Sequence, residues 1–329
     1  MNNSNTSDTL VKIITIVRYT SLILIALVLS YFILAQFILP DERDEVDPYT
    51  TMNEGWTYID ATGNEKTVTI AGYGNRVQGE VVTITNTIPD NLAGINALCY
   101  HAMWQDVKIY INDELRAEYS TEDSRAFGNS SAIRFIFANI RPDDAGKEVR
   151  IETITNTTYA GHYRAVYIGD KMGIFMFLFN SSIPKATLTL SMIILCLLVI
   201  LICSILMIFY KKHIPLVYLA LSMFFAAFWI FSEIDLRQFV FRNVSALSNM
   251  TFWSLMFIPP PLVLFINDIQ NNRHKKIHIF PLVYQVIIII LISILQIFNI
   301  ADFRNTLFLM HFGIIVSIIS IFASILIDI

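Results

Sequence analysis

The sequence contains few cysteines and few charged residues, and each shortage excludes a class of protein. Of its three cysteines only Cys99 lies in the polar middle part, which excludes a disulfide framework there. Cys196 and Cys203 lie in an apolar stretch, where thiols behave as small hydrophobic side chains. No spacing of Cys and His fits a zinc site, so we predict no metal. Charged residues make up 15% of the chain and the formal net charge is −4, which argues against a nucleic-acid partner.

The sequence also lacks the residue patterns of an enzyme. It contains no recognisable pair of catalytic carboxylates and no nucleophile with a neighbouring base. A nucleotide-binding glycine-rich loop, a "GGDEF"-type segment and a histidine-kinase box are likewise missing from it. We therefore predict no catalytic residues and no cofactor for these 329 residues.

Apolar residues are abundant: they make up 55% of the chain, which indicates an integral membrane protein. A helix crosses the hydrocarbon core of a bilayer with about 20 apolar residues. Six stretches are long enough, namely 13–39, 186–210, 214–233, 248–267, 279–298 and 305–327. The first is long for a signal-peptide core and no Ala-x-Ala-like site comes after it. We interpret it as an uncleaved signal anchor, with a cleaved signal peptide as the alternative.

The basic residues near the ends of these stretches indicate an orientation, because short loops rich in Lys and Arg face the cytoplasm. Such residues occur in alternate connections, at Lys12 and Arg18, at Lys211 and Lys212, and at Arg273, Lys275 and Lys276. We therefore expect a multi-pass protein of the cell membrane, with the lipid bilayer as a partner. Its predicted parts are a cytoplasmic N-terminus (1–12), a transmembrane anchor (13–39), an extracytoplasmic domain (40–184) and five helices of a transmembrane bundle (185–329).

The polar part, residues 40–184, has the pattern of an all-β domain. It begins with the acidic, turn-rich linker "PDERDEVDPYTTMNEG". Runs such as "GEVVTITNTI", "DVKIYINDELRAEY" and "KEVRIETITN" then alternate at period two, and turn residues separate them. Seven or eight strands with this spacing predict a β-sandwich. Two hairpins, "VKIYINDELRAEYS" and "IRFIFANIRPDDAGKEVRIETITN", resemble jelly-roll modules related to galactose-binding domains. The predicted fold is therefore a multi-pass α-helical membrane protein with an inserted extracytoplasmic all-β jelly-roll domain.

Two segments of the polar part are candidates for ligand binding. "CYHAMWQD" and "YAGHYRAVY" interleave aromatic residues, histidine and charge, and aromatic faces with nearby donors suit a carbohydrate or a small organic molecule. The candidate ligand-binding residues are His101, Trp104, His162, Tyr163 and Arg164. The alternative is that the aromatic residues pack the sandwich and the histidines lie on loops.

Three ionisable residues come directly after an apolar run in "FWIFSEIDLRQFVFRN". An unpaired charge in hydrocarbon costs about 2.5–3.5 kcal/mol, so we expect Glu233, Asp235 and Arg237 to be paired or hydrated. Glu233 and Arg237 are four residues apart, which places them on one face if the helix continues. We predict that this cluster docks against the sensor domain or neighbouring helix ends and relays movement. The alternative is a helix cap at the membrane surface.

The fourth apolar stretch contains Pro259, Pro260 and Pro261. Proline lacks a backbone N–H and clashes with the preceding turn, so these residues must interrupt or kink the helix. A membrane protein tolerates this where neighbours or water satisfy the freed backbone groups. We expect a flexing point for signalling here, with static packing geometry as the alternative.

Three segments resemble one family. They are "GKEVRIETITNTTYAGHYRAVYIGD", "LVYLALSMFFAAFWIFSEIDLRQFVFRN" and the later "LMFIPPPLVLFI". The chain is similar, over nearly all of its length, to bacterial seven-transmembrane receptors with diverse intracellular signalling modules. The resemblance implies an extracytoplasmic sensor, a helical bundle and a cytoplasmic output domain, often a diguanylate cyclase and sometimes a histidine kinase.

The resemblance also implies further parts of the protein and a function. Seven helices come after the sensor in that family and five are predicted here, so we expect two more helices and an output domain after Ile329. The implied function is a receptor for an extracytoplasmic small molecule or carbohydrate. A transporter or channel-associated protein with an extracytoplasmic binding domain is the alternative, and a homodimer is left open.

Overall fold

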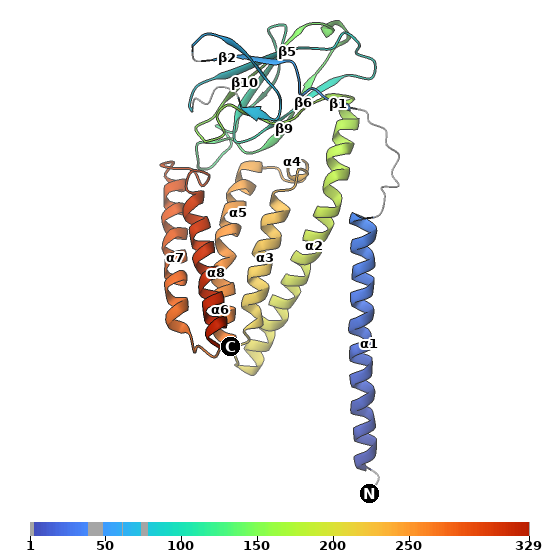
Figure 1. Ribbon diagram of the computed structural model, residues 1–329, viewed down its shortest axis with the longest axis vertical. Coiled ribbons are helices and arrows are strands. Elements are labelled where there is room, and N and C mark those ends of the chain that lie inside the picture. The colour runs from blue at the N-terminus through green and yellow to red at the C-terminus, as the bar shows by residue number, and fades with distance from the viewer. Residues whose placement is uncertain (1–2, 39–48, 61, 74–77, 329) are drawn as a thin grey trace. The chain divides into compact units, whose positions relative to one another are not determined.

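The computed structural model describes residues 3–38, 49–60, 62–73 and 78–328, and the chain divides into two units. The first unit, Met1–Val46, contains helix α1 (Asn3–Phe37). The second, Asp47–Ile329, contains all the strands and the remaining helices (Figure 1). The first part of the predicted acidic linker, residues 40–48, lies outside the described residues.

The strands form two larger antiparallel sheets and one short pair, and we call residues 49–169 the β domain. The four-stranded sheet has the order β1 (Tyr49–Thr51), β12 (Val166–Gly169), β6 (Ala97–Ala102), β9 (Arg134–Asn139). The six-stranded sheet has the order β3 (Glu65–Val68), β2 (Trp56–Ile59), β5 (Val82–Thr87), β10 (Glu148–Ile154), β7 (Asp106–Ile111), β8 (Glu114–Tyr119). The short pair joins β11 (His162–Tyr163) to β4 (Gly72–Tyr73), and a 3₁₀ helix covers Pro142–Asp144. The prediction of a strand-rich domain is confirmed.

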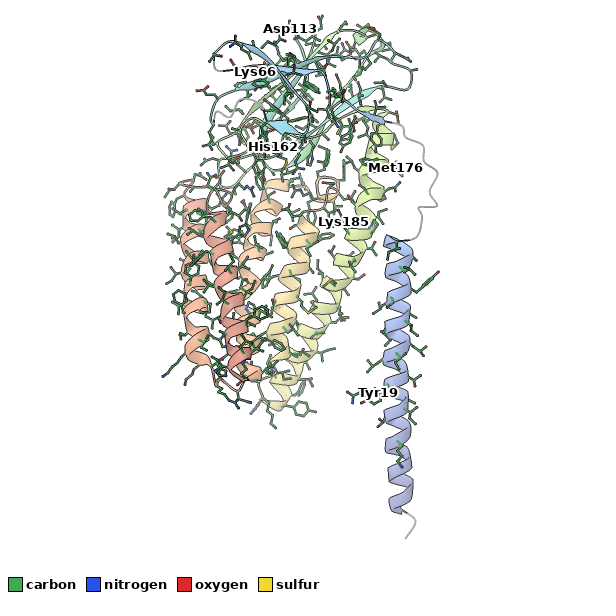
Figure 2. All side chains as sticks on the ribbon, in the orientation of Figure 1. Tyr19, Lys66, Asp113, His162, Met176 and Lys185 are labelled. Atoms are coloured by element: carbon green, nitrogen blue, oxygen red, sulfur yellow. The ribbon has the colours of Figure 1, made fainter. Side chains whose placement is uncertain are left out.

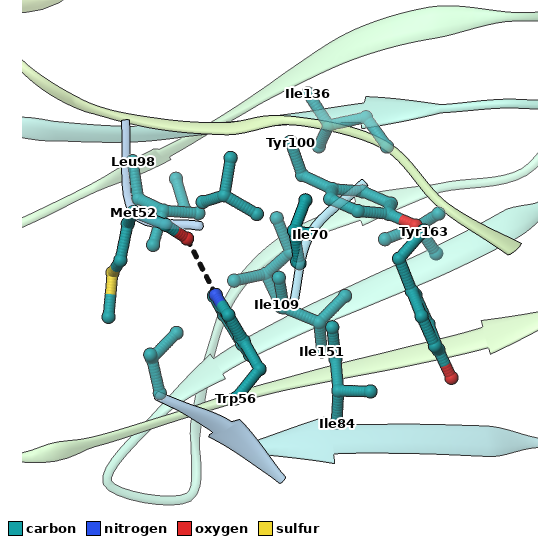
Figure 3. Close-up of a cluster of buried hydrophobic side chains, with 14 of the residues drawn as sticks. Met52, Trp56, Ile70, Ile84, Leu98, Tyr100, Ile109, Ile136, Ile151 and Tyr163 are labelled. Atoms are coloured by element: carbon teal, nitrogen blue, oxygen red, sulfur yellow. Dashed lines mark hydrogen bonds between the residues drawn. The ribbon is translucent and has the colours of Figure 1, made fainter. Parts of the chain in front are cut away.

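The period-two alternation of the sequence explains the core of the β domain. Ile151 of β10 lies opposite Ile84 on one side and Ile109 on the other, and all three side chains are buried (Figure 3). Trp56 is also fully buried, and its Nε1 donates to the carbonyl of Met52 at 2.6 Å. Burying such β-branched and aromatic side chains between two facing sheets is the main stabilising contribution to this domain.

Helix α2 (Lys171–Tyr210) begins almost directly after strand β12. The Asp170 side chain caps the helix by accepting from the backbone N–H of Gly173 at 3.0 Å. At 1.5 Å per residue its 40 residues extend about 60 Å, which is longer than a bilayer core requires. The helix begins well before the predicted span at 186–210, because Ile174 and Leu178 pack in a buried cluster with residues of the four-stranded sheet. Residues 171–184, assigned from sequence to the extracytoplasmic domain, are therefore helical.

The remaining helices are α3 (Leu216–Ser232), α4 (Arg237–Val240), α5 (Val244–Phe257), α6 (Pro259–Ile269), α7 (Lys275–Ile297) and α8 (Leu307–Asp328). Within the part of the chain that the structure describes, four helical segments are long and apolar enough to cross a membrane, namely Lys171–Tyr210, Val244–Ile269, Lys275–Ile297 and Leu307–Asp328. Two other predicted spans coincide with shorter apolar segments, Thr15–Tyr31 and Leu216–Ser232. The structure therefore supports a membrane protein with a β domain.

The three prolines interrupt the fourth predicted span as expected. Helix α5 ends at Phe257 and α6 begins at Pro259, where a missing N–H is tolerated because the first turn of a helix has no intrahelical acceptor for it. At the break, Ser222 of α3 donates to the carbonyl of Ile258 at 2.8 Å. A neighbouring helix thus supplies a polar partner where the backbone is irregular.

Candidate functional site

The end of the β domain that meets the helices brings together most of the predicted site residues. His162 lies at this end, whereas Asp113 and Lys66 lie at the opposite end (Figure 2). Besides the continuous α2, several contacts join the β domain to the helices, among them hydrogen bonds from Asn243 Nδ2 to the carbonyl of Ser124 at 3.2 Å and from Arg304 Nη2 to the hydroxyl of Tyr159 at 2.6 Å. Two sets of these contacts contain buried polar groups of the helical part. We call them the β9–α4 contact and the loop contact, the latter formed by residues 127–130 with residues 299–304.

The β9–α4 contact is built on the backbone of an edge strand. Strand β9 is the last strand of its sheet, so its outward N–H and C=O groups need partners from elsewhere. The Gln238 side chain supplies both: its Oε1 accepts from the N–H of Phe135 at 2.6 Å, and its Nε2 donates to the carbonyl of Phe135 at 3.3 Å. The side-chain amide of α4 therefore pairs with β9 as a neighbouring strand would.

Arg237 adds a buried charge to the β9–α4 contact. Only 5% of its side chain is exposed, and burial lowers the pKa of Arg237 whereas Glu233 and Asp235 raise it. Its Nη1 donates to the carbonyl of Ser232 at 3.0 Å, and its Nη2 donates to the carbonyl of Ile133 in the β domain at 3.4 Å. The guanidinium therefore links the end of α3 to the segment that leads into β9.

The predicted ion pair between Glu233 and Arg237 is present but long, at 3.9 Å between Oε1 and Nη1. The reason is that α3 does not continue: Glu233 caps its C-terminus, and Arg237 begins the separate helix α4. Between them, Asp235 is half-buried, and burial raises the pKa of Asp235 while Arg237, Lys185 and Arg164 lower it. Backbone carbonyls, rather than Glu233, are the close partners of the Arg237 guanidinium.

His101 lies beside the β9–α4 contact. Its ring stacks on that of Phe135, with centroids 4.1 Å apart and planes inclined by 14°. Burial lowers the pKa of His101 to about 3, and the positive charges of Arg164 and Arg237 contribute to the same shift. The imidazole is therefore neutral at physiological pH and serves as an aromatic surface behind the strand edge that Gln238 pairs with.

The loop contact depends on an acceptor that the helices present to the β domain. Asp302, in the α7–α8 connection, is 6% exposed. It accepts from the backbone N–H of Asn129 at 2.7 Å and from the hydroxyl of Ser130, while the side chain of Asn299 accepts from the N–H of Gly128 at 2.5 Å. The buried carboxylate is thus satisfied by donors from the β domain.

Gly128 is required at its position for two reasons. Its φ is +91°, a conformation that residues with a side chain rarely adopt, and a Cβ there would overlap the side-chain amide of Gln296. Gln296 is itself held in place, because its Oε1 accepts from the N–H of Phe303 at 2.6 Å. The loop can approach the helices this closely only without a side chain at residue 128.

Aromatic side chains fill the space around the loop contact. Trp104 contacts Phe252 with ring centroids 5.5 Å apart, and Phe127 contacts Trp253 at 5.9 Å. A cavity of about 20 Å³ remains between these rings and Asp302, enough for about one water molecule. Trp104, predicted as a ligand contact, therefore lies where the β domain packs on the helices.

The other predicted ligand residues do not converge on one site. His162 stacks on Tyr73 at 4.5 Å, in the short β4–β11 pair. Tyr163 is fully buried in the core of the β domain. Arg164 donates from Nε to the sulfur of Met103 at 2.7 Å and is electrostatically coupled to His101 and Asp235. Only His101 and Arg164 lie near the relay residues.

The residues that form the contacts most directly were not among the sequence candidates. Gln238 comes directly after Arg237 in "FWIFSEIDLRQFVFRN". Its neutral amide did not indicate a functional role, because glutamine is common on protein surfaces. Asp302 is a lone acid in the connection "NIADFRN", and its partners lie more than 170 residues away in sequence. Within the described residues, no group of three or more His, Cys, Asp or Glu side chains is arranged to hold a metal ion.

Comparison with known proteins adds no assignment: no protein-family model, curated protein or solved structure matches the chain. The two contacts are therefore the basis for the functional conclusion.

Proposed function

We propose that the chain is the sensor and membrane part of a transmembrane signalling receptor. In this proposal the β domain is an extracytoplasmic, galactose-binding-like jelly roll that detects a carbohydrate or a small organic molecule. The helices pass its movement to a cytoplasmic output domain, with a diguanylate cyclase as the favoured candidate. The observation that supports the proposal best is the attachment of the β domain to separate helical elements through buried polar contacts.

This attachment suits the transmission of movement. The β domain continues directly into α2, pairs with α4 through Gln238, and receives Asp302 from the α7–α8 connection. A change in the orientation of its sheets would therefore shift α4 and this connection relative to α2. A ligand produces such a shift when it binds one arrangement more tightly than the other. A domain that served only as a tethered binding module would not require the buried Arg237 and Asp302.

The positions of the basic residues support an extracytoplasmic β domain. The β domain lies at the end of α2 where Lys171 begins the helix, and Lys211 and Lys212 lie just past the opposite end (Figure 1). Lys275 and Lys276, at the start of α7, lie at that same opposite end of the helices. Under the positive-inside rule this opposite end faces the cytoplasm.

Thiol labelling of intact cells tests the orientation. The three native cysteines are buried, so a reagent that cannot cross the membrane should react only with an introduced, exposed thiol. We expect Ala93→Cys, in an exposed loop of the β domain, to be labelled in intact cells. The matched variant Lys212→Cys should be labelled only after permeabilisation. The reverse pattern would refute the proposal.

A ligand screen on the full chain tests the sensor function. Purified protein is heated with individual sugars and small organic acids, and a compound that binds the folded state raises the unfolding temperature. The same compound should change the labelling rate of Lys212→Cys, at the far end of the helices. A compound that stabilises the protein without changing this rate would indicate binding without signal transfer.

A transporter is the second candidate, and buried polar residues in α7 favour it. His278, Gln285 and Gln296 are each 4% exposed or less, and His278 Nδ1 lies 2.8 Å from the hydroxyl of Ser320 on α8. Polar residues inside a membrane helix often mark a substrate or ion pathway. The test is to reconstitute the protein in liposomes and to measure uptake of a ligand found in the screen. Uptake that is lost in Gln285→Leu would favour the transporter over the receptor.

A further inference from the structure

A pocket of about 420 Å³ lies between α2 and the end of α3, next to the β9–α4 contact. Helix α2 contributes Ser182 and Lys185, α3 contributes Trp229 and Ile230, and the turn after α3 contributes Glu233 and Asp235. All of these residues belong to the helical part of the chain, and none is a candidate ligand residue of the β domain. The pocket is therefore distinct from the predicted ligand site of the sensor.

Two opposite charges line this pocket without pairing to each other. Lys185 is exposed and Asp235 is half-buried, and among the residues that the structure describes neither forms an ion pair within 4.0 Å. They are nevertheless close enough for Lys185 to lower the pKa of Asp235, against the raising effect of burial. A ligand with an anionic group and a cationic group could pair with both at once.

The surroundings place this pocket at a membrane surface. The longest apolar run of α2, residues 186–210, comes directly after Lys185. One turn further along, Leu188 is 47% exposed, and Ile230 on α3 is 44% exposed. Lys and Trp near the end of an apolar helix are typical of the level at which lipid headgroups lie. The charged pocket therefore borders an apolar surface of the kind that contacts acyl chains.

We propose that this pocket binds the headgroup of a phospholipid that carries both a phosphate and a primary ammonium group, such as phosphatidylethanolamine. Lys185 pairs with the phosphate, Asp235 and Glu233 accept from the ammonium, and the acyl chains lie along Leu188 and Ile230. The inference rests on the proposed membrane placement of these helix ends, but not on the identity of the sensor's ligand.

Native mass spectrometry of the delipidated full chain tests this inference. We expect the protein to retain phosphatidylethanolamine about tenfold better than phosphatidylglycerol, which has the phosphate but no ammonium. Asp235→Asn should reduce this preference and Asp235→Asn with Glu233→Gln should abolish it, whereas Lys185→Met should weaken retention of both lipids equally. Asp123→Asn and Lys171→Met remove charges of the same signs at exposed positions outside the pocket and should leave the preference unchanged. Each variant is first shown to unfold cooperatively on heating.

Three results would overturn the inference. Equal retention of the two lipids by the unsubstituted protein would mean that no ammonium is recognised, and an intact preference in Asp235→Asn would place recognition elsewhere. Displacement of the lipid by water-soluble glycerophosphoethanolamine at equal concentration would identify a soluble ligand instead. A failure of the lipid proposal can be distinguished from a failure of the proposed receptor function. Labelling of Ala93→Cys tests the orientation of the β domain and does not depend on which lipid is bound.

Discussion

The β9–α4 contact and the loop contact differ in how they are made. At the β9–α4 contact, the helical part reaches toward backbone groups of an edge strand with the long side chains of Gln238 and Arg237. At the loop contact, the β domain inserts a glycine-containing loop against a fixed carboxylate, Asp302, with aromatic rings around it. Long side chains can adapt to a small movement, whereas a close-packed loop cannot. We therefore expect the loop contact to be the rigid attachment and the β9–α4 contact to be the adjustable one.

The largest effect should come from adding a side chain at Gly128. In Gly128→Ala the Cβ both strains a backbone with φ of +91° and overlaps Gln296, so we expect a loss of about 3 kcal/mol in the free energy of unfolding. Thermal or denaturant unfolding of the purified protein measures this. Gly94→Ala is the matched control, because its φ is +74° but nothing lies within 4 Å of the added Cβ. Equal losses in the two variants would mean that the loop is not tightly packed.

Removing the charge of Asp302 should have the next largest effect. Asp302→Asn keeps the shape of the side chain but weakens the hydrogen bonds that it accepts from Asn129 and Ser130. We expect the free energy of unfolding to fall by about 2 kcal/mol. We expect the loop to detach more often, so that trypsin cleaves faster after Arg125. The control Asp123→Asn removes an exposed acid near the same loop. Unchanged cleavage in Asp302→Asn would show that the carboxylate does not hold the loop.

A smaller effect is expected at the adjustable contact. Gln238→Leu preserves the size of the side chain but removes both hydrogen bonds to Phe135, which should destabilise this contact by about 1 kcal/mol. Hydrogen exchange of the Phe135 amide should become about fivefold faster. The amide of Ile151, in a strand paired on both sides, serves as the internal reference. A similar acceleration at both amides would indicate general loosening instead of a local contact.

The stability of the protein should also depend on pH through His101. Its pKa is about 3 in the folded protein and 6.5 ordinarily, so the unfolded chain takes up a proton that the folded one does not. The contribution of the neutral His101 to the free energy of unfolding is therefore fully present above pH 6.5 and is lost as the pH falls toward 3. We expect His101→Phe, which keeps the ring stacking on Phe135, to reduce the fall in unfolding temperature between about pH 7.5 and about pH 5. An identical fall in both proteins would show that another group is responsible.

Much of the architecture could be predicted because it depends on local pattern. Alternation such as that around Ile109 and Ile151 specifies which face of a strand is buried, and long apolar runs specify helices suited to a membrane. The break at Pro259 results from the chemistry of proline alone. The start of α2 at Lys171 was missed because its first turns pack on a sheet that only the folded domain provides.

The candidate site, by contrast, was decided by tertiary structure. The sequence by itself placed Glu233, Asp235 and Arg237 at a helix end and supplied a reason for them to be paired or hydrated. It did not select Gln238, Asp302 or Gly128, because their partners lie more than 100 residues away along the chain. Hydrogen bonding to a distant backbone leaves no periodic signal in sequence, and which side chain meets a strand edge is determined only when the elements pack together.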